Sequence, residues 1–121
     1  AVHYTHYNGI IHRDIKPENY LYKNKNNGYL IKLTDFGLAN PSAPMSPCVY
    51  TSFYRPPEIA NLDGKRELYS YSSDIWALGC TLYELVTGRV LLEFRIGKGN
   101  NILGRENARL KILYQNVESK L

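Results

Sequence analysis

The sequence predicts an α+β fold that is mainly helical and contains one small β-hairpin. Two short runs rich in strand-forming residues, 20–22 and 29–33, flank a polar stretch with an Asn-Gly step, which favours a tight turn. The segment 75–86 is almost entirely apolar, as expected of a helix in the centre of a core. Near the end of the chain, residues 107–117 have apolar side chains at helical spacing.

The first nine residues read as the end of a helix, because Asn8-Gly9 is a typical helix stop. The chain starts at Ala1 without a methionine and stops at Leu121 directly after a helical pattern. We therefore expect a piece of a longer protein.

The hairpin is expected to consist of strands at 20–22 and 29–33 joined by the turn KNKNNG. Such a hairpin places residues 14–19 and 35–37 at neighbouring ends of two paired strands. The long segment 38–57, with five prolines, has little periodicity, and loops of this length are usually functional or mobile.

The apolar segment is predicted to form a buried central helix at about 73–87. Ser72 or Ser73 can cap it, Asp74 suits the positive end of its dipole, and Gly88 stops it. Glu84 is the only charged residue between positions 75 and 86, so the helix is expected to be covered on nearly all sides. A further one-sided helix is expected at about 105–118.

Composition narrows the class of protein. With 121 residues, 44% of them hydrophobic and 21% charged, the chain fits one globular domain. The net charge of +4 is spread along the sequence, with no run of cations longer than Lys65-Arg66, which argues against a nucleic-acid or membrane partner and suits a phosphate-bearing ligand. No apolar run approaches 18 residues, and Cys48 and Cys80 read as reduced thiols of an intracellular protein.

The segment IIHRDIKPEN, residues 10–19, places an imidazole, two cations, two carboxylates and an amide directly before the first expected strand. Asn19 and Asp35 supply oxygen atoms from two neighbouring strands, and magnesium takes few such protein ligands and completes its shell with substrate phosphate. Asp14 is then left to accept or orient a hydroxyl proton, while Lys16 neutralises transferring charge. Gly37 allows the chain to turn sharply after Asp35.

The pieces HRDIKPEN, DFG, PPE and SDIWALG stand in this order, and together they resemble the large lobe of eukaryotic protein kinases. The resemblance extends from residue 1 to about 118 and implies a partial kinase domain covering 1–121. Its catalytic loop would be 12–19, its magnesium loop 35–37 and its activation segment 35–58. The small lobe is not in the sequence, so we expect the 121 residues alone to be inactive or nearly so.

The resemblance assigns roles residue by residue and implies ATP and Mg²⁺ as cofactors. Asp14 would be the catalytic base and Lys16 the charge stabiliser at the γ-phosphate, and Asn19 and Asp35 would hold the metal. Lys16, Asn19, Leu21 and Asp35 would line the nucleotide site. The sequence KPEN is similar to the corresponding sequence of serine/threonine kinases.

The same resemblance implies two packing residues and one structural acid. His12 and Phe36 would lie in the apolar stack that aligns the two lobes, so His12 is interpreted as structural. Asp74 resembles the aspartate that hydrogen-bonds the backbone of the catalytic loop. Glu58 would pair with an arginine beyond the end of the chain.

Regulation and substrate docking are implied by a closer resemblance to the cyclin-dependent and mitogen-activated kinases. Arg13 would receive a phosphate in the activation segment, and Ser46 stands where those kinases carry an activating phosphothreonine. A phosphorylated Ser46, with an upstream activating kinase as partner, and a plain loop serine both stay open. Thr51 would bridge towards the catalytic residues, and Arg55 would help dock protein substrates that have a proline after the phosphorylated residue.

Two other classes of function remain open. A pseudokinase or scaffold module would keep the fold without the chemistry, although the four residues such proteins often lose are all present. A self-contained interaction domain would require the chain to fold alone. We expect instead that it is unstable in isolation, because the central helix lacks some of its covering.

Overall fold

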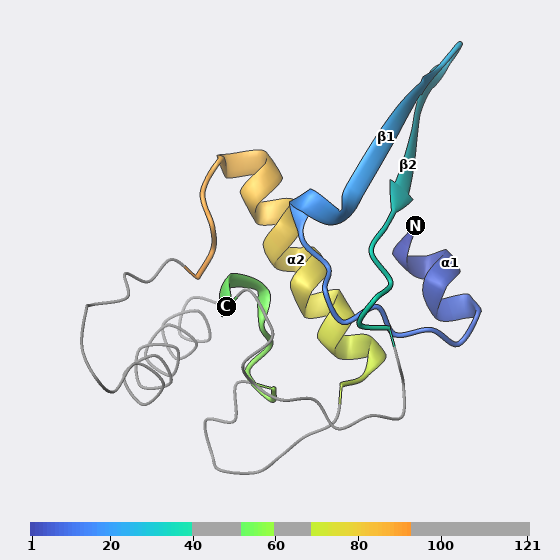
Figure 1. The fold of residues 1–121 in the computed structure, drawn as a ribbon. Helices are drawn as coiled ribbons and strands as arrows, with labels where there is room; N and C mark the ends of the chain where they lie inside the picture. The colour runs from blue at the N-terminus through green and yellow to red at the C-terminus, as the bar shows by residue number, and fades with distance from the viewer. Residues whose placement is uncertain (40–51, 60–68, 93–121) are drawn as a thin grey trace.

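A computed structural model of the chain describes residues 1–39, 52–59 and 69–92 (Figure 1). In chain order its elements are α1 (Val2–Tyr7), η1 (Pro17–Asn19), β1 (Tyr20–Lys25), β2 (Gly28–Leu33), η3 (Ser52–Tyr54) and α2 (Tyr71–Thr87), where η marks a 3-10 helix. The mixture of helices and one antiparallel hairpin confirms the two kinds of element predicted. The helix expected at 105–118 lies outside the described residues.

The hairpin is longer than the sequence suggested. Its strands pair in register from Tyr20 opposite Leu33 to Lys25 opposite Gly28, so only Asn26 and Asn27 form the turn. Gly28 has φ +141°, the positive φ that a glycine supplies here. The two strands extend away from α1 and α2 (Figure 1), and the pairing continues through the polar residues that we assigned to the turn.

Helix α2 begins two residues before the predicted start. Its N-cap is Ser70, whose side chain and backbone form a reciprocal capping box with Ser73. The prediction that Ser72 or Ser73 caps the helix is therefore wrong, because Ser73 is the third helical residue of that box. The predicted stop is confirmed, since Gly88 has φ +68° and its amide donates to the Glu84 carbonyl over 2.8 Å.

In the described part of the chain, the buried residues of α2 lie on one face of the helix. Its buried residues are Ser73, Asp74, Ala77, Cys80 and Thr81. On other faces Leu82, Leu85 and Val86 are 53%, 66% and 84% exposed, so the expectation of a helix covered on nearly all sides is wrong for this structure. Apolar composition indicates that a helix can be buried, but it does not say which neighbours are present to bury it.

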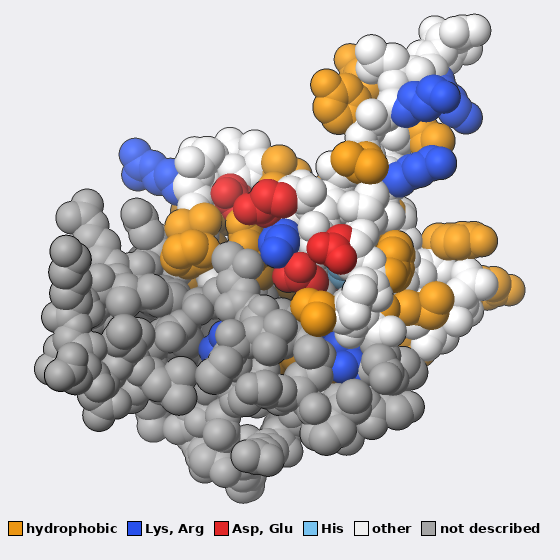
Figure 2. All heavy atoms as spheres, in the orientation of Figure 1, with side chains coloured by type: hydrophobic (Ala, Val, Ile, Leu, Met, Phe, Trp, Pro, Cys, Tyr) orange, Lys and Arg blue, Asp and Glu red, His pale blue; other side chains and the backbone are white. Residues whose placement is uncertain are grey.

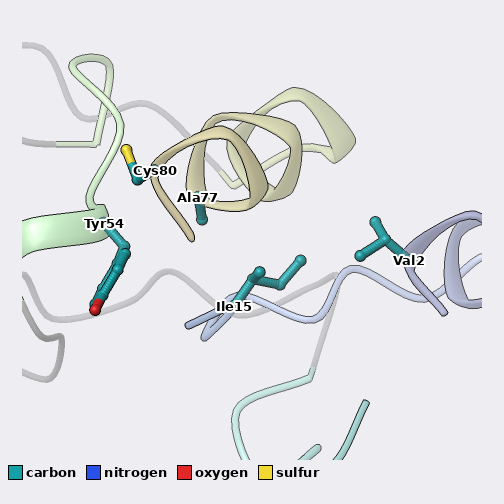
Figure 3. Close-up of a cluster of buried hydrophobic side chains, with 5 residues drawn as sticks. All are labelled: Val2, Ile15, Tyr54, Ala77 and Cys80. Atoms are coloured by element: carbon teal, nitrogen blue, oxygen red, sulfur yellow. The ribbon is translucent and has the colours of Figure 1, made fainter. Parts of the chain in front are cut away.

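The core anchors the segment 12–19 through one buried side chain, that of Ile15. Ile15, 1% exposed, packs in one cluster with Val2 of α1, Tyr54 of η3, and Ala77 and Cys80 of α2 (Figure 3). Burying a side chain of this size contributes about 1.5–3 kcal/mol. Ile15 therefore anchors the loop from which Asp14 and Lys16 project.

Trp76 and Leu78, which lie in the apolar segment expected to form the buried helix, are half-buried against the same cluster. Among the described residues, no helix has both the length and the hydropathy to cross a bilayer.

Candidate active site

The carboxylate of Asp74 binds two backbone amides of the loop 12–19, which the resemblance assigns as the catalytic loop. Its Oδ2 accepts from the His12 amide and its Oδ1 from the Arg13 amide, each over 2.8 Å, and the residue is 1% exposed. This confirms the structural role predicted for Asp74. Charge-assisted bonds of this length to buried amides are worth about 1.5–3 kcal/mol each.

The backbone of Arg13, in the same loop, is held in an unusual conformation. Arg13 has φ +71°, in the left-handed region that costs a residue with a Cβ roughly 1–2 kcal/mol. The bond from its amide to Asp74 offsets this cost. As a result the chain turns sharply immediately before Asp14.

His12 links the catalytic loop to the end of β2. The ring is fully buried, its Nε2 donates to the Thr34 carbonyl over 2.9 Å, and its Nδ1 accepts from the Asp14 amide over 3.2 Å. These two bonds require the tautomer with the proton on Nε2. The structural interpretation of His12 is confirmed.

The edge of the Phe36 ring meets His12, with ring centroids 4.7 Å apart. Phe36 is nevertheless 43% exposed, so the expectation that it packs internally is wrong for the described structure.

Asp14 is oriented by two neighbours from its own loop. Its Oδ2 accepts from Lys16 Nζ over 3.0 Å and from Asn19 Nδ2 over 3.1 Å. Asn19 Nδ2 also donates to the Asp14 carbonyl over 2.7 Å. The structure thus brings together three predicted site residues and holds one carboxylate oxygen of Asp14, Oδ2, in place.

The second acid lies at the neighbouring strand end. The Thr34 amide donates to the Asn19 carbonyl over 2.8 Å, which ties the end of β2 to η1 immediately before Asp35. Asp35 is exposed and has φ +61°, a second left-handed backbone in the same site. A Cβ at Gly37 would lie 3.3 Å from Asp35 Oδ1, so a glycine leaves that carboxylate its room.

These oxygen atoms fit a magnesium ion bound together with phosphate. Both hydrogen bonds made by the Asn19 side chain use Nδ2, which leaves its Oδ1 as a ligand, and the Asp35 carboxylate is accessible. Within the described residues there is no cluster of three or more His, Cys, Asp or Glu able to hold a metal. A site of few protein ligands is typical of magnesium.

The remaining predicted residues are placed as follows. Arg13 and Arg55 are 4% and 5% exposed and line, together with Asp14 and Asp74, a cavity of about 10 Å³, the room needed by one water. Leu21 lies on β1 and is 58% exposed. Ser46 and Thr51 lie outside the described residues.

Two contacts of the site were not predicted. His6, in the last turn of α1, binds Asp74 Oδ2 through its Nε2 over 2.8 Å. Glu58 accepts a hydrogen bond from the buried Ser73 hydroxyl over 3.1 Å. We expected an arginine as the partner of Glu58 and did not predict this serine. No local signal marks either contact, since each joins segments that are distant in sequence.

A carboxylate held by a lysine and an asparagine, with a second carboxylate after the paired strand, is the arrangement typical of protein kinase domains. The sequence matches the model of the protein kinase domain over residues 1–119, and the chain belongs to that family.

Among known proteins it is similar to cyclin-dependent kinase 11 of Dictyostelium discoideum, with 44% identity over 97 residues. The match covers 77% of this chain and 25% of that protein, so the chain spans about a quarter of the relative's length.

Proposed function

We propose that the protein containing this chain transfers the γ-phosphoryl group of ATP to serine and threonine hydroxyls of protein substrates. The observation that carries the proposal is the arrangement of Asp14, Lys16 and Asn19, joined by contacts of 2.7–3.1 Å. The family match and the similarity to a cyclin-dependent kinase support it.

In this proposal Asp14 orients the substrate hydroxyl and accepts its proton on Oδ1. Its other oxygen stays bound to Lys16 and Asn19, so the reactive oxygen is presented in one direction. Lys16 also places positive charge beside the transferring group, where it offsets the charge that develops on the phosphate oxygens.

Asn19 Oδ1 and the Asp35 carboxylate would hold magnesium, which supplies positive charge to the phosphates when it is bound. Leu21, 58% exposed on β1, would offer an apolar surface to the nucleotide. The left-handed backbone at Asp35 and the missing Cβ at Gly37 keep the metal-binding oxygen atoms accessible.

Regulation and substrate choice are further parts of the proposal. A phosphate on Ser46 would bind Arg13, whose amide and backbone are already fixed by Asp74, and an upstream kinase would deliver it. Thr51 would bridge to the catalytic residues and Arg55 would favour substrates with a following proline. The relative's name, cyclin-dependent kinase 11, supports membership of this group. Proline-directed and other substrates stay open, because Tyr50 stands where that group commonly has a small aliphatic residue.

The proposal is tested with the full-length protein and Asp14→Asn. Phosphate transfer to peptides with serine or threonine, with and without a following proline, should fall by about 10²–10⁴, the usual contribution of a positioned base. Glu84→Gln is a matched control, because it removes one acid from α2 without touching the loop.

If wild type transfers phosphate no faster than Asp14→Asn while Glu84→Gln folds normally, the proposal fails and a scaffold role replaces it. Nothing in the described residues favours that second function now.

A further inference from the structure

The segment 52–59 lies beside the catalytic loop. Arg55, which is 5% exposed, lines the same cavity of about 10 Å³ as Arg13 and Asp14. The proposed function gives this segment the task of docking the protein substrate, and we call residues 52–59 the docking segment. Its position relative to Asp14 therefore decides the direction from which a substrate hydroxyl approaches.

The charged groups of the site are open to solvent and do not orient a substrate by themselves. Figure 2 shows acidic side chains gathered around a basic one at the surface, near the base of the hairpin. Asp14 and Lys16 are half-buried, and Asp35 is exposed. A hydroxyl can approach such a surface from many directions, so a neighbouring element has to fix the backbone of the substrate.

The two ends of the docking segment are held against α2 in different ways. Near its start Tyr54 is 8% exposed and packs in the core cluster with Ala77 and Cys80 of the helix. Near its end Glu58 accepts a hydrogen bond from the Ser73 hydroxyl over 3.1 Å. Ser73 precedes Cys80 by two helical turns, about 10 Å along the axis. A segment held at one end can rotate about that point, and a second contact at this distance prevents the rotation.

The backbone between these two contacts is stiff. Pro56 and Pro57 each fix their own φ angle, and the side chain of Pro56 is fully buried. The Ile59 amide donates to the Pro56 carbonyl over 3.1 Å and closes a turn that contains Glu58. A shift of Glu58 is therefore transmitted to Arg55 instead of being absorbed by the intervening chain.

The hydroxyl of Ser73 is used both as an acceptor and as a donor. The residue is fully buried, accepts from the Ser70 amide over 3.2 Å and donates its single proton to Glu58 Oε1. A hydrogen bond to a carboxylate belongs to the stronger class. Since this bond uses Oε1, the arginine that we expected to pair with Glu58 can bind Oε2 without displacing Ser73.

Ser73 and its neighbour Asp74 connect two segments to the same turn of α2. Asp74 accepts from the amides of His12 and Arg13 in the catalytic loop, whereas Ser73 donates to Glu58 in the docking segment. The two residues are 1% and 0% exposed. Because consecutive residues of a helix are rigidly joined, this pair fixes the distance between the two segments.

We propose that Ser73 is a positioning residue for the protein substrate. Its hydroxyl, acting through Glu58, sets the position of the docking segment relative to Asp14. This inference rests on the proposed function and adds a residue to which the resemblance assigns no role. The hydrogen bonds of Ser73 go to Ser70 and Glu58, away from the groups proposed to hold ATP and magnesium. Loss of the hydroxyl therefore raises the KM for the protein substrate and leaves the KM for ATP unchanged.

The test compares Ser73→Thr with Ser73→Val in the full-length protein. The two side chains have nearly the same shape and only threonine keeps the hydroxyl, so the comparison cancels the effect of the added methyl group. Steady-state kinetics use ATP and the serine and threonine peptides of the preceding test. We expect a peptide KM at least fivefold higher for Ser73→Val than for Ser73→Thr, with kcat and the KM for ATP within twofold of each other.

Ser70→Ala is the matched control, because it removes the side chain that caps the same end of α2 without touching Glu58. Its peptide KM should stay within twofold of wild type. Ser73→Ala adds no methyl group, should raise the peptide KM at least threefold over wild type, and supplies the result if Ser73→Val does not fold.

Equal peptide KM values for Ser73→Val and Ser73→Thr, or an equal rise in Ser70→Ala, overturn this inference while phosphate transfer by wild type upholds the proposed function. A parallel rise in the KM for ATP also overturns it, because such a rise indicates a general loss of structure. A wild type that transfers no phosphate refutes the proposed function itself, and this inference with it.

Discussion

Replacing Asp74 by asparagine tests whether the catalytic loop depends on one buried carboxylate. The two amides of His12 and Arg13 use different oxygens of Asp74, whereas an asparagine side chain has one oxygen. One amide must then face an NH₂ group. An unsatisfied buried donor costs about 1–3 kcal/mol, and losing part of the His6 contact adds about 1 kcal/mol.

The loop can change its conformation without unfolding the rest of the domain. Without its bond to Asp74, Arg13 can leave φ +71° and regain roughly 1–2 kcal/mol of backbone energy. The two costs sum to about 2–4 kcal/mol, and a shift of about 3 kcal/mol towards the relaxed loop lowers the population of the active loop by up to ~100-fold, since 1.4 kcal/mol is a factor of ten. We therefore expect kcat to fall by up to ~100-fold while the KM for ATP changes little.

Steady-state kinetics of the full-length protein and chemical unfolding measure the two parts of this prediction. Glu84→Gln is the matched control, because it changes an acid of the same helix to its amide and affects only the Tyr54 contact. Its kcat should stay within twofold of wild type. A kcat for Asp74→Asn within twofold of wild type, at an unchanged free energy of unfolding, would refute the reasoning.

Three further predictions concern single side chains. Gly37→Ala should raise the Mg²⁺ concentration for half-maximal rate severalfold, because the new Cβ lies 3.3 Å from Asp35 Oδ1; an unchanged magnesium titration contradicts this. Cys80 should resist iodoacetamide at pH 8 until the protein unfolds, since it is 2% exposed and burial raises the pKa of its thiol to about 11; rapid labelling of native protein, with the other cysteine changed to serine, argues against it. Tyr54→Phe should cost about 1–2 kcal/mol of unfolding free energy through its 2.6 Å bond to Glu84. Burial and the bond to Glu84 raise the pKa of Tyr54 above 10.0, so the stability that its hydroxyl contributes is complete below pH 10 and is lost gradually as pH rises towards the raised pKa. Denaturant melts should therefore show a smaller difference between the two proteins at pH 10.5 than at pH 8, and an equal difference at both pH values would count against the bond.

The ends of the helices could be predicted from the sequence because the residues that end a helix lie next to one another in the chain. Gly88 ends α2 through a left-handed cap, and Asn8 with Gly9 ends α1, each by a conformation that the residue type favours. The hairpin was predicted too short because residues 23–25 are polar and exposed on both faces, so no burial pattern distinguished strand from turn.

The parts of the site that were not predicted depend on packing. Whether α2 is covered depends on its neighbours, and the exposure of Leu85 and Val86 could not follow from their hydrophobicity. His6 meets Asp74 across 68 residues of sequence, and Ser73 meets Glu58 across 15. Periodicity and capping rules have no information about such contacts.

The buried contacts also explain why the site keeps its form although its reactive groups are near the surface. Asp14, Lys16 and Asp35 reach solvent to different degrees, and exposed ion pairs by themselves contribute little to stability. Their positions follow from Ile15 in the core and from Asp74 beneath the loop, both 1% exposed. The groups proposed to act on a phosphate and a hydroxyl can therefore remain accessible, because the residues that determine their positions are different ones.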